Sequence, residues 1–318
     1  MDVLVTGGAG FIGSNLVRCL AAAGDHVRVL DDLSTGSLDN LADTNGMADI
    51  TIGDIRDQDA LARVIAGVDV VYHLAALPSV TRSIHEPVAT NSVNVDGTLN
   101  VLEWARRAEV RRVVYASSSS IYGDAPVLPK HEDMTPGPLS PYAAAKFAGE
   151  TYCRVYTHVF GLETISLRFF NVFGPKQDPA SEYAAVIPRF ISQVLRGERV
   201  VIFGDGAQSR DFTFVANAVQ ACVLAGAAGP EAAGEVINVA CGERIALLDL
   251  IDALGGIFGT RLDPVFSAAR EGDVRHSLAS ITKAERLLGY RPLVTVRDGL
   301  ARTVEWLWER ERTATQAT

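Results

Sequence analysis

Short apolar runs alternate with longer amphipathic stretches through the first half of the chain. The runs predict strands at 3–6, 26–30, 50–52, 68–73 and 112–116, and the stretches predict helices at 14–23, 60–65 and 91–109. Because these strands are nearly all apolar, we expect a parallel sheet with helices on both faces, a doubly wound α/β fold. Ligands of such folds bind beyond the carboxyl ends of the strands.

The alternation of apolar runs and amphipathic stretches becomes less regular from residue 177 onward. It predicts helices at 186–196, 216–227, 247–258, 281–288 and 296–310, and strands at 200–203, 235–239 and 263–266. We expect a large domain over 1–175, to which 212–240 returns, and a smaller α/β C-terminal lobe over 176–211 and 241–318. This lobe should close over a substrate held between the two parts, and residues 313–318 should fray.

Three glycines lie between the first predicted strand and the first predicted helix. Gly7, Gly10 and Gly13 have the spacing of a dinucleotide-binding turn, which needs a tight bend, close approach to a pyrophosphate and close helix packing. The second strand ends in Asp31, where an acid can bind the adenosine ribose hydroxyls. A carboxylate there would repel a 2′-phosphate, so this Rossmann-type domain is predicted to bind NAD rather than NADP.

Further cofactor contacts are expected beside the glycine turn and where the neighbouring strands end. Small residues at a strand end let a dinucleotide come close, and the loop after the second strand is polar. The additional candidates are Phe11, Ile12, Asp32, Ser34, Thr35, Gly36, Asp54, Ile55, Leu74, Ala75, Ala76 and Asn94.

Composition and charge narrow the range of partners. The formal net charge of −9 argues against a nucleic acid or an anionic membrane surface, and no apolar run reaches membrane-spanning length. The cysteines, Cys19, Cys153, Cys222 and Cys241, lack metal-type spacing, so we expect no metal and buried free thiols in a reducing compartment. Since the first residues already form a strand, we expect no signal peptide and a cytoplasmic protein.

A tyrosine and a lysine form the candidate catalytic pair. Tyr142 and Lys146 are four residues apart, so they share a face of the helix predicted to begin at Pro141. An ammonium one turn from a phenol stabilises the phenolate and lowers the pKa of the tyrosine from about 10. Such a tyrosine can act as a base or an acid near neutral pH. The serines at 117–120 follow a strand and should lie nearby.

Together these features resemble the extended short-chain dehydrogenase/reductases, and within them the nucleotide-sugar 4-epimerases. The likeness covers nearly the whole chain and continues in motifs at 54–55, 73–76, 117–123, 167–174, 204–206, 210–212 and 270–273. It implies an isomerase whose tyrosine takes the proton of the sugar 4-hydroxyl while the C4 hydride goes to a tightly held NAD. The 4-keto sugar then rotates in the site, and the hydride returns to its opposite face.

The resemblance also implies roles for individual residues. Tyr142 would be the base, Lys146 would assist it and bind the nicotinamide ribose, and Ser118 would meet the substrate O4. Ser119 is the alternative, because the serine run leaves the register open by one. The implied UDP-sugar contacts are Ser79, Val80, Asn171, Arg210, Arg270, Asp273 and Ser277, with Val186, Ile187 and Phe203 around the uracil.

Two points about these roles stay open. Arg210 and Arg270 suit phosphate oxygens, but each also has an acidic neighbour with which it could form a surface ion pair. Some members of the family carry a lysine where this chain has Pro78. Either NAD is held less tightly here, or Arg82 takes the place of that lysine.

Position 277 bears on the identity of the sugar. The segments 177–179, 183–188 and 272–278 resemble most the bacterial UDP-N-acetylglucosamine 4-epimerases. In epimerases restricted to plain hexoses, a tyrosine at the place of Ser277 fills the space beside the sugar C2. A serine leaves room for an acetamido group, and selection by size works through steric exclusion. We expect interconversion of UDP-GlcNAc and UDP-GalNAc, with UDP-Glc and UDP-Gal as slower substrates.

Three other functions are weighed against this one. A UDP-glucuronate 4-epimerase or decarboxylase needs a cation or hydroxyl facing the C6 carboxylate, which the serines or an arginine could supply. A 4,6-dehydratase needs an acid–base pair after its catalytic hydroxyl, and Ser119 and Ser120 offer no carboxylate. A non-catalytic NAD-binding regulator would have no need of the serine, the tyrosine and the lysine.

We also expect a homodimer. The predicted helices at 93–107 and 142–160 carry more apolar side chains than one domain face needs, and two copies of each would form an isologous four-helix contact. The alternative is that these side chains pack on the sheet. They are Leu99, Leu102, Trp104, Phe147, Tyr152, Val155 and Tyr156.

Overall fold

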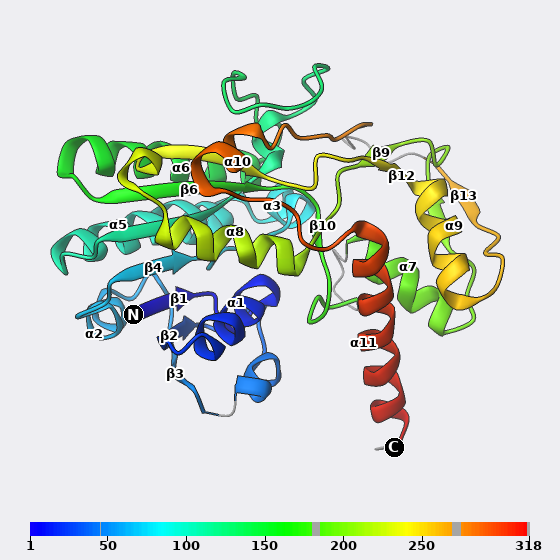
Figure 1. Cartoon of the computed structure of the whole chain (residues 1–318), viewed down its shortest axis with the longest axis horizontal. Helices are drawn as coiled ribbons and strands as arrows, with labels where there is room; N and C mark the ends of the chain where they lie inside the picture. The colour runs from blue at the N-terminus through cyan, green and yellow to red at the C-terminus, as the bar shows by residue number, and fades with distance from the viewer. Residues whose placement is uncertain (45, 180–184, 269–274, 317–318) are drawn as a thin grey trace.

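A seven-stranded parallel sheet forms the centre of the molecule (Figure 1). The computed structural model describes residues 1–44, 46–179, 185–268 and 275–316. The strand order β11–β6–β5–β4–β1–β2–β3 reverses between β1 and β4, which is where doubly wound sheets bind ligands. The strands are β1 (Asp2–Thr6), β2 (His26–Asp31), β3 (Ala48–Ile52), β4 (Val70–His73), β5 (Arg112–Ser118), β6 (Glu163–Phe169) and β11 (Glu235–Val239).

Helices cover both faces of this sheet, as predicted. Side chains alternate between the faces of a strand, so Val3 and Val5 join one apolar cluster and Leu4 joins the other. The first cluster includes α1 (Phe11–Ala22) and α8 (Val215–Ala227), and the second includes α2 (Gln58–Ile65), α5 (Thr98–Arg107) and α6 (Pro141–Phe160). The predicted doubly wound α/β fold is confirmed.

The continuous α-helix predicted at 91–109 is wrong in detail. The segment consists of α4 (Pro87–Asn91), a π-helical stretch η2 (Ser92–Gly97) and α5. Apolar periodicity does not distinguish a π turn from an α turn, because the change lies in which carbonyl each amide reaches. The pattern also gave no prediction of α3 (Val80–His85), of the edge helix η1 (Leu38–Thr44) or of β6.

Many of the apolar side chains that we expected at a dimer contact are instead buried inside the protomer. Leu102 and Tyr156 are buried in the second cluster, and Leu99, Trp104 and Tyr152 pack against it. These side chains fill the space between α5, α6 and the sheet, so their number alone does not indicate a partner.

The remaining elements form a group beside the sheet (Figure 1). Helix α11 (Val296–Gln316) packs against α7 (Val186–Leu195) and α9 (Leu247–Phe258), whereas α10 (Thr282–Leu288) packs against β11 and α8. Short strands pair in twos: β8 (Val201–Phe203) with β13 (Val265–Ser267), β9 (Ser209–Arg210) with β12 (Ile245–Ala246), and β7 (Val172–Phe173) with β10 (Thr213–Phe214). The division into two domains stays a prediction.

The cysteines are free thiols, but the prediction that all are buried is wrong. Cys153 and Cys222 are buried, Cys241 is half-buried and Cys19 is exposed, because α1 turns that position toward solvent. Among the described residues, no helix combines the length and the apolar character that crossing a membrane requires.

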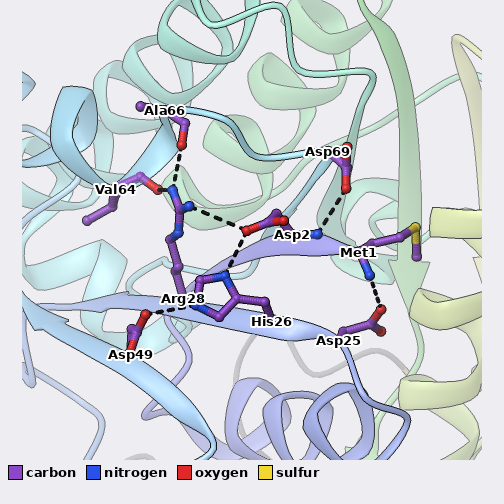
Figure 2. Close-up of polar contacts among 9 residues, drawn as sticks. All are labelled: Met1, Asp2, Asp25, His26, Arg28, Asp49, Val64, Ala66 and Asp69. Atoms are coloured by element: carbon purple, nitrogen blue, oxygen red, sulfur yellow. Dashed lines mark hydrogen bonds and ion pairs between the residues drawn. The ribbon is translucent and has the colours of Figure 1, made fainter.

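A polar cluster ties the first two strands together at their amino ends (Figure 2). The ring of His26 lies 2.7 Å from Asp2 through Nδ1 and 3.0 Å from Asp49 through Nε2. Arg28 donates to the carbonyls of Val64 and Ala66, and lies 3.4 Å from the same Asp2 oxygen. The hydrogen bond to Asp2, followed by that to Asp49, raises the pKa of His26.

This cluster should make stability depend on pH. A histidine whose pKa is raised on folding stabilises fully below its unfolded pKa, about 6.5, and this contribution is lost as pH rises through the folded pKa. We therefore expect His26→Gln to lower the urea midpoint at pH 6 and to have less effect at pH 9. The control is Leu293→Gln, at a site that is 72% exposed and carries no titratable group, and it should give the same difference at both pH values. An equal effect of His26→Gln at both would contradict the prediction.

Candidate active site

A cleft of about 1100 Å³ runs along the carboxyl ends of the strands. It brings together nearly all of the cofactor candidates, which come from the ends of β1, β2, β3 and β4. Those that line it are Gly7, Gly10, Phe11, Ile12, Gly13, Asp31, Asp32, Ser34, Thr35, Gly36, Asp54, Ile55, Leu74, Ala75 and Ala76.

The glycine turn has the geometry that a dinucleotide needs. Gly7 has φ +72°, which favours glycine, and a Cβ on Gly13 would overlap the Gly7 carbonyl oxygen. Helix α1 begins beyond Gly10 with no side-chain cap, so amides of its first turn are left for an anion. The residues present therefore fit the pyrophosphate of NAD.

Asp31 holds the glycine turn as well as facing the cleft. Its carboxylate accepts hydrogen bonds from the amides of Ala9 and Leu33, both at 2.8 Å, and the residue is only 7% exposed. Burial raises the pKa of Asp31, while the two amides oppose that shift. A carboxylate in this position suits a neutral diol such as a ribose, and its assignment to the cofactor stays a prediction.

Asn94 stands apart from the other cofactor candidates, because it is not among the described residues that line the cleft. Its side-chain amide accepts from the Leu77 amide at 2.8 Å and donates to the Leu77 carbonyl at 3.1 Å. Asn94 lies in the π-helical stretch η2 and therefore shapes the turn that carries Ser79 and Val80, which do line the cleft.

Tyr142 and Lys146 both reach the cleft from the first turns of α6. The helix begins at Pro141, with the Ser140 hydroxyl accepting from the Ala143 amide. Lys146 donates to the Ala116 carbonyl at 2.7 Å, and burial lowers the pKa of its ammonium to about 8. The lysine is thus tied to the end of β5 as well as lying one turn from the phenol.

The electrostatics of Tyr142 differ from the expectation. Burial raises the pKa of the phenol, and a hydrogen bond with Ser118 opposes the shift. The two causes of this shift are burial and the Ser118 bond, and the Lys146 ammonium donates to the Ala116 carbonyl. Within the part of the chain that the structure describes, burial therefore outweighs the interaction that lowers the pKa of Tyr142.

The structure separates the serines by their partners. Ser117 is buried and donates to Glu150, which also pairs with Arg168 at 2.8 Å. Ser118 faces Tyr142 and accepts from the Ser120 hydroxyl at 2.9 Å. Ser119 lines the cleft too. The arrangement favours Ser118 as the hydroxyl beside the reacting atoms.

The predicted substrate residues lie at the other end of the cleft. Asn171, Arg210 and Ser277 line it, and the Asn171 amide lies 3.5 Å from the Ser277 hydroxyl. An adjoining cavity of about 270 Å³ shares Asn171 and Arg210 with the cleft and is lined by Val186, Ile187 and Phe203. Arg210 donates to the carbonyls of Ser209 and Arg275. Arg270 and Asp273 lie outside the described residues.

The cleft is also lined by residues that were not predicted, among them Tyr122, Lys130 and His276. Lys130 comes from an irregular loop and is brought to the cleft by main-chain bonds to Leu278 and Ser280. No periodicity or motif marks such a residue. His276 lay within a segment singled out for its resemblance, and its side chain bonds Ser209 at 2.9 Å.

Comparison with known proteins agrees with this geometry. Residues 3–240 match the NAD dependent epimerase/dehydratase family. The chain belongs to this family. The resemblance inferred from the sequence and the prediction of NAD as cofactor are thereby confirmed.

Members of the family with assigned activities are similar over nearly the full length. A UDP-glucose 4-epimerase of Mycolicibacterium smegmatis is 43% identical over 311 residues, 96% of this chain and 98% of that protein. A UDP-N-acetylglucosamine 4-epimerase from Methanobrevibacter ruminantium M1, in complex with UDP-N-acetylmuramic acid, has a TM-score of 0.93 at 38% identity, with 97% and 98% covered. A UDP-glucuronic acid 4-epimerase variant from Bacillus cereus, in complex with UDP-4-deoxy-4-fluoro-glucuronic acid and NAD, has a TM-score of 0.90 at 34%, with 98% and 100% covered.

The glycine turn generates a direct test of cofactor binding. We expect Gly13→Ala to weaken NAD binding at least about tenfold, or ~1.4 kcal/mol, because its Cβ would push α1 away from the Gly7 carbonyl. Titration calorimetry with NAD measures the affinity.

The matched control is Gly256→Ala in α9, where a Cβ meets open space. It should leave NAD affinity unchanged and stabilise the helix by about 0.5–1 kcal/mol. Parent-like NAD affinity in Gly13→Ala would show that the dinucleotide binds elsewhere.

Proposed function

We propose that this protein is an NAD-dependent UDP-sugar 4-epimerase that interconverts UDP-GlcNAc and UDP-GalNAc, and UDP-Glc and UDP-Gal more slowly. The observation that carries the proposal is the meeting of Tyr142, Ser118 and Lys146 in a cleft that also holds the glycine turn. A phenol beside a dinucleotide site can remove a hydroxyl proton while the carbon next to it is oxidised.

Each group has a role that follows from its place. Tyr142 takes the proton from the sugar 4-hydroxyl, and Ser118 hydrogen-bonds to the same oxygen. Lys146, tied to the Ala116 carbonyl, holds its charge beside the phenol. Bound NAD supplies the hydride acceptor for C4 and the positive charge that the phenolate needs. Return of the hydride to the opposite face of C4, together with the proton held by Tyr142, would invert C4 and complete the reaction without net oxidation.

Ser277 supports the choice of the acetamido sugars. It lines the cleft near Asn171, and a serine side chain leaves space that a larger one would occupy. A pocket enlarged in this way admits the bigger sugar without strongly rejecting the smaller one. Both series should therefore react.

A second candidate is a UDP-glucuronate 4-epimerase, and Lys130 is the observation that favours it. Lys130 lines the cleft, and its ammonium donates to the Ala125 carbonyl. A carboxylate at the sugar C6 would pair with a cation of this kind. We rank it second because Ser277 gives a separate reason for the acetamido series.

The first experiment incubates the protein with UDP-GlcNAc, UDP-Glc and UDP-GlcA separately, with and without added NAD, and resolves the products by chromatography and proton NMR. Formation of UDP-GalNAc supports the proposal. Conversion of UDP-GlcA alone would move the assignment to the second candidate. Tyr142→Phe is the control for chemistry, because loss of the phenol should lower kcat by about 10²–10⁴-fold. Unchanged activity in Tyr142→Phe would show that the phenol is not the base, and absence of product from all three sugars, with or without NAD, would point to a different nucleotide sugar or a non-catalytic NAD-binding protein.

Ser277→Tyr tests the sugar pocket. We expect turnover of UDP-GlcNAc to fall about 100-fold or more because a phenol ring would occupy the acetamido space. Turnover of UDP-Glc, followed in the same preparation, should stay within threefold of the parent and serves as the internal control. Intact acetamido-sugar turnover would remove Ser277 from the specificity argument.

We propose a homodimer through α4 and α6, in which α4 replaces the helix predicted at 93–107, because apolar side chains of that helix pack inside the protomer. Val88 in α4 is 82% exposed and Val159 in α6 is 61% exposed, and the two helices pack together. Ile84 in α3 and Phe160 in α6 are also more than half exposed. A second copy would cover these side chains, and one helix pair from each protomer would make the four-helix contact.

Val88→Arg tests this interface. Two arginines facing each other across a dimer axis would repel, so the variant should sediment as a monomer at micromolar concentration while the parent sediments as a dimer. The control is Leu293→Arg, at another highly exposed site (72%, against 82% for Val88) that precedes α11. It should leave the parent's sedimentation unchanged. A monomeric parent would contradict the proposal outright.

A further inference from the structure

Asp211 joins three separate segments at the substrate end of the cleft. It is fully buried, and its carboxylate accepts backbone hydrogen bonds from Cys241 at 3.0 Å, Gly242 at 3.2 Å and Ala279 at 3.1 Å. Its own carbonyl accepts from the Asn171 side chain at 3.0 Å. We call these five residues the Asp211 hub.

The hub borders the residues proposed to bind the sugar nucleotide. Asp211 follows Arg210 in the chain, Ala279 follows Ser277 by two positions, and Asn171 lies 3.5 Å from the Ser277 hydroxyl. Asn171 has φ +36°, a conformation that costs free energy for a residue other than glycine. Its bond to the Asp211 carbonyl helps to hold it there.

We propose that Asp211 is a positioning residue that sets the place of Ser277 against the sugar, and thereby the preference for acetamido sugars over plain hexoses. This inference rests on the proposed function. The segment bearing Ser277 also bonds the carbonyl of Ser209 and the main chain of Lys130. Asp211 adds a charge-assisted bond to it, and bonds of this kind are about twice as strong as neutral ones. It also ties the segment to the end of β11.

The protonation state of Asp211 should affect this hold. Burial raises its pKa to about 7, while the three amides oppose the shift and Glu243 adds to it. Among the described residues, the thiol of Cys241 and the phenol of Tyr290 also interact with it. The ionised carboxylate of Asp211 can accept hydrogen bonds from all three amides. When it is protonated, one of its oxygens carries a hydrogen, and this O–H cannot form a hydrogen bond with an amide N–H that is also a donor. The hub should therefore loosen below neutral pH.

The test compares the parent with Asp211→Asn, which keeps the shape but replaces one acceptor by an NH₂ group. We expect the variant's KM for UDP-GlcNAc to rise about tenfold while kcat changes less than threefold. The ratio of kcat/KM for UDP-GlcNAc over UDP-Glc should fall at least about fivefold. In the parent, the ratio of kcat/KM for UDP-GlcNAc over UDP-Glc should be lower at pH 6 than at pH 8, because Asp211 is protonated at the lower pH. In the variant, which lacks this carboxyl group, the ratio should be the same at both pH values.

Arg112→Met is the control for a purely structural effect. Arg112 is buried at the amino end of β5, opposite the cleft, where it pairs with Glu163 at 2.6 Å and donates to the Ala225 and Ala228 carbonyls. This variant should lower Tm and leave the substrate ratio unchanged. Equal loss of activity on both sugars in Asp211→Asn, with no change in the ratio, would overturn the proposal.

Two further measurements keep the inference separate from the proposed function. The pH dependence of the parent's ratio tests the hub even if Asp211→Asn does not fold, and a ratio that is flat between pH 6 and 8 counts against it. Calorimetric titration with UDP-GlcNAc and UDP-Glc gives the same comparison without turnover. If the parent binds both sugars but converts neither, the proposed function fails and the affinity ratio still tests the hub. If it binds neither, both fail.

Discussion

The close packing of α1 on the turn after β1 is the contact on which the rest of the molecule depends. The carbonyl of Gly7 occupies the place where any side chain on residue 13 would stand, so the helix can lie against the sheet only with glycine there. This contact directs the first turn of α1 at the cleft and brings its apolar face, with Leu16 and Leu20, onto the sheet beside α8. Both the first apolar cluster and the anion-binding end of α1 therefore depend on the absence of a side chain at residue 13.

Buried polar networks fix the strand ends that surround this turn. His73 lies between the hydroxyls of Thr6 and Thr98, at 2.8 and 2.9 Å, and burial lowers its pKa to about 3, so the ring is neutral. It links β1, β4 and α5 without placing a charge beneath the cleft. Arg168 of β6 and Glu150 of α6 form a buried pair, and the Glu150 carboxylate also accepts a hydrogen bond from Ser117 of β5. Such pairs contribute little net stability, and here the pair engages the Ser117 hydroxyl, whereas the Ser118 hydroxyl faces Tyr142.

The two ends of the cleft are built differently. At the cofactor end, the candidate residues follow the carboxyl ends of β1, β2, β3 and β4. Main-chain hydrogen bonds between these strands hold the strand ends, and with them the candidate residues, in place. The substrate end uses two-residue strands, β7, β9, β10 and β12, which pair over too short a length to be stable alone. Side chains such as Asp211 and Asn171 supply the missing ties. We infer that substitutions near the second end change sugar selectivity more readily than cofactor binding.

The sequence by itself determined the parallel sheet, the helices on both faces and the glycine turn, since apolar period and glycine spacing are properties of neighbours in the chain. Tertiary structure alone decided the π turn of η2, the exposure of Cys19 and the course of β6. It also decided which serine meets Tyr142, because the partner of Ser117 is Glu150, 33 residues away. The sequence marked Asp211 only as part of the motif at 210–212, and neither its bond to an amide 68 residues away nor the raised pKa of Tyr142 could be predicted from it. Burial and hydrogen bonds between distant segments depend on how the chain packs, and no local pattern encodes them.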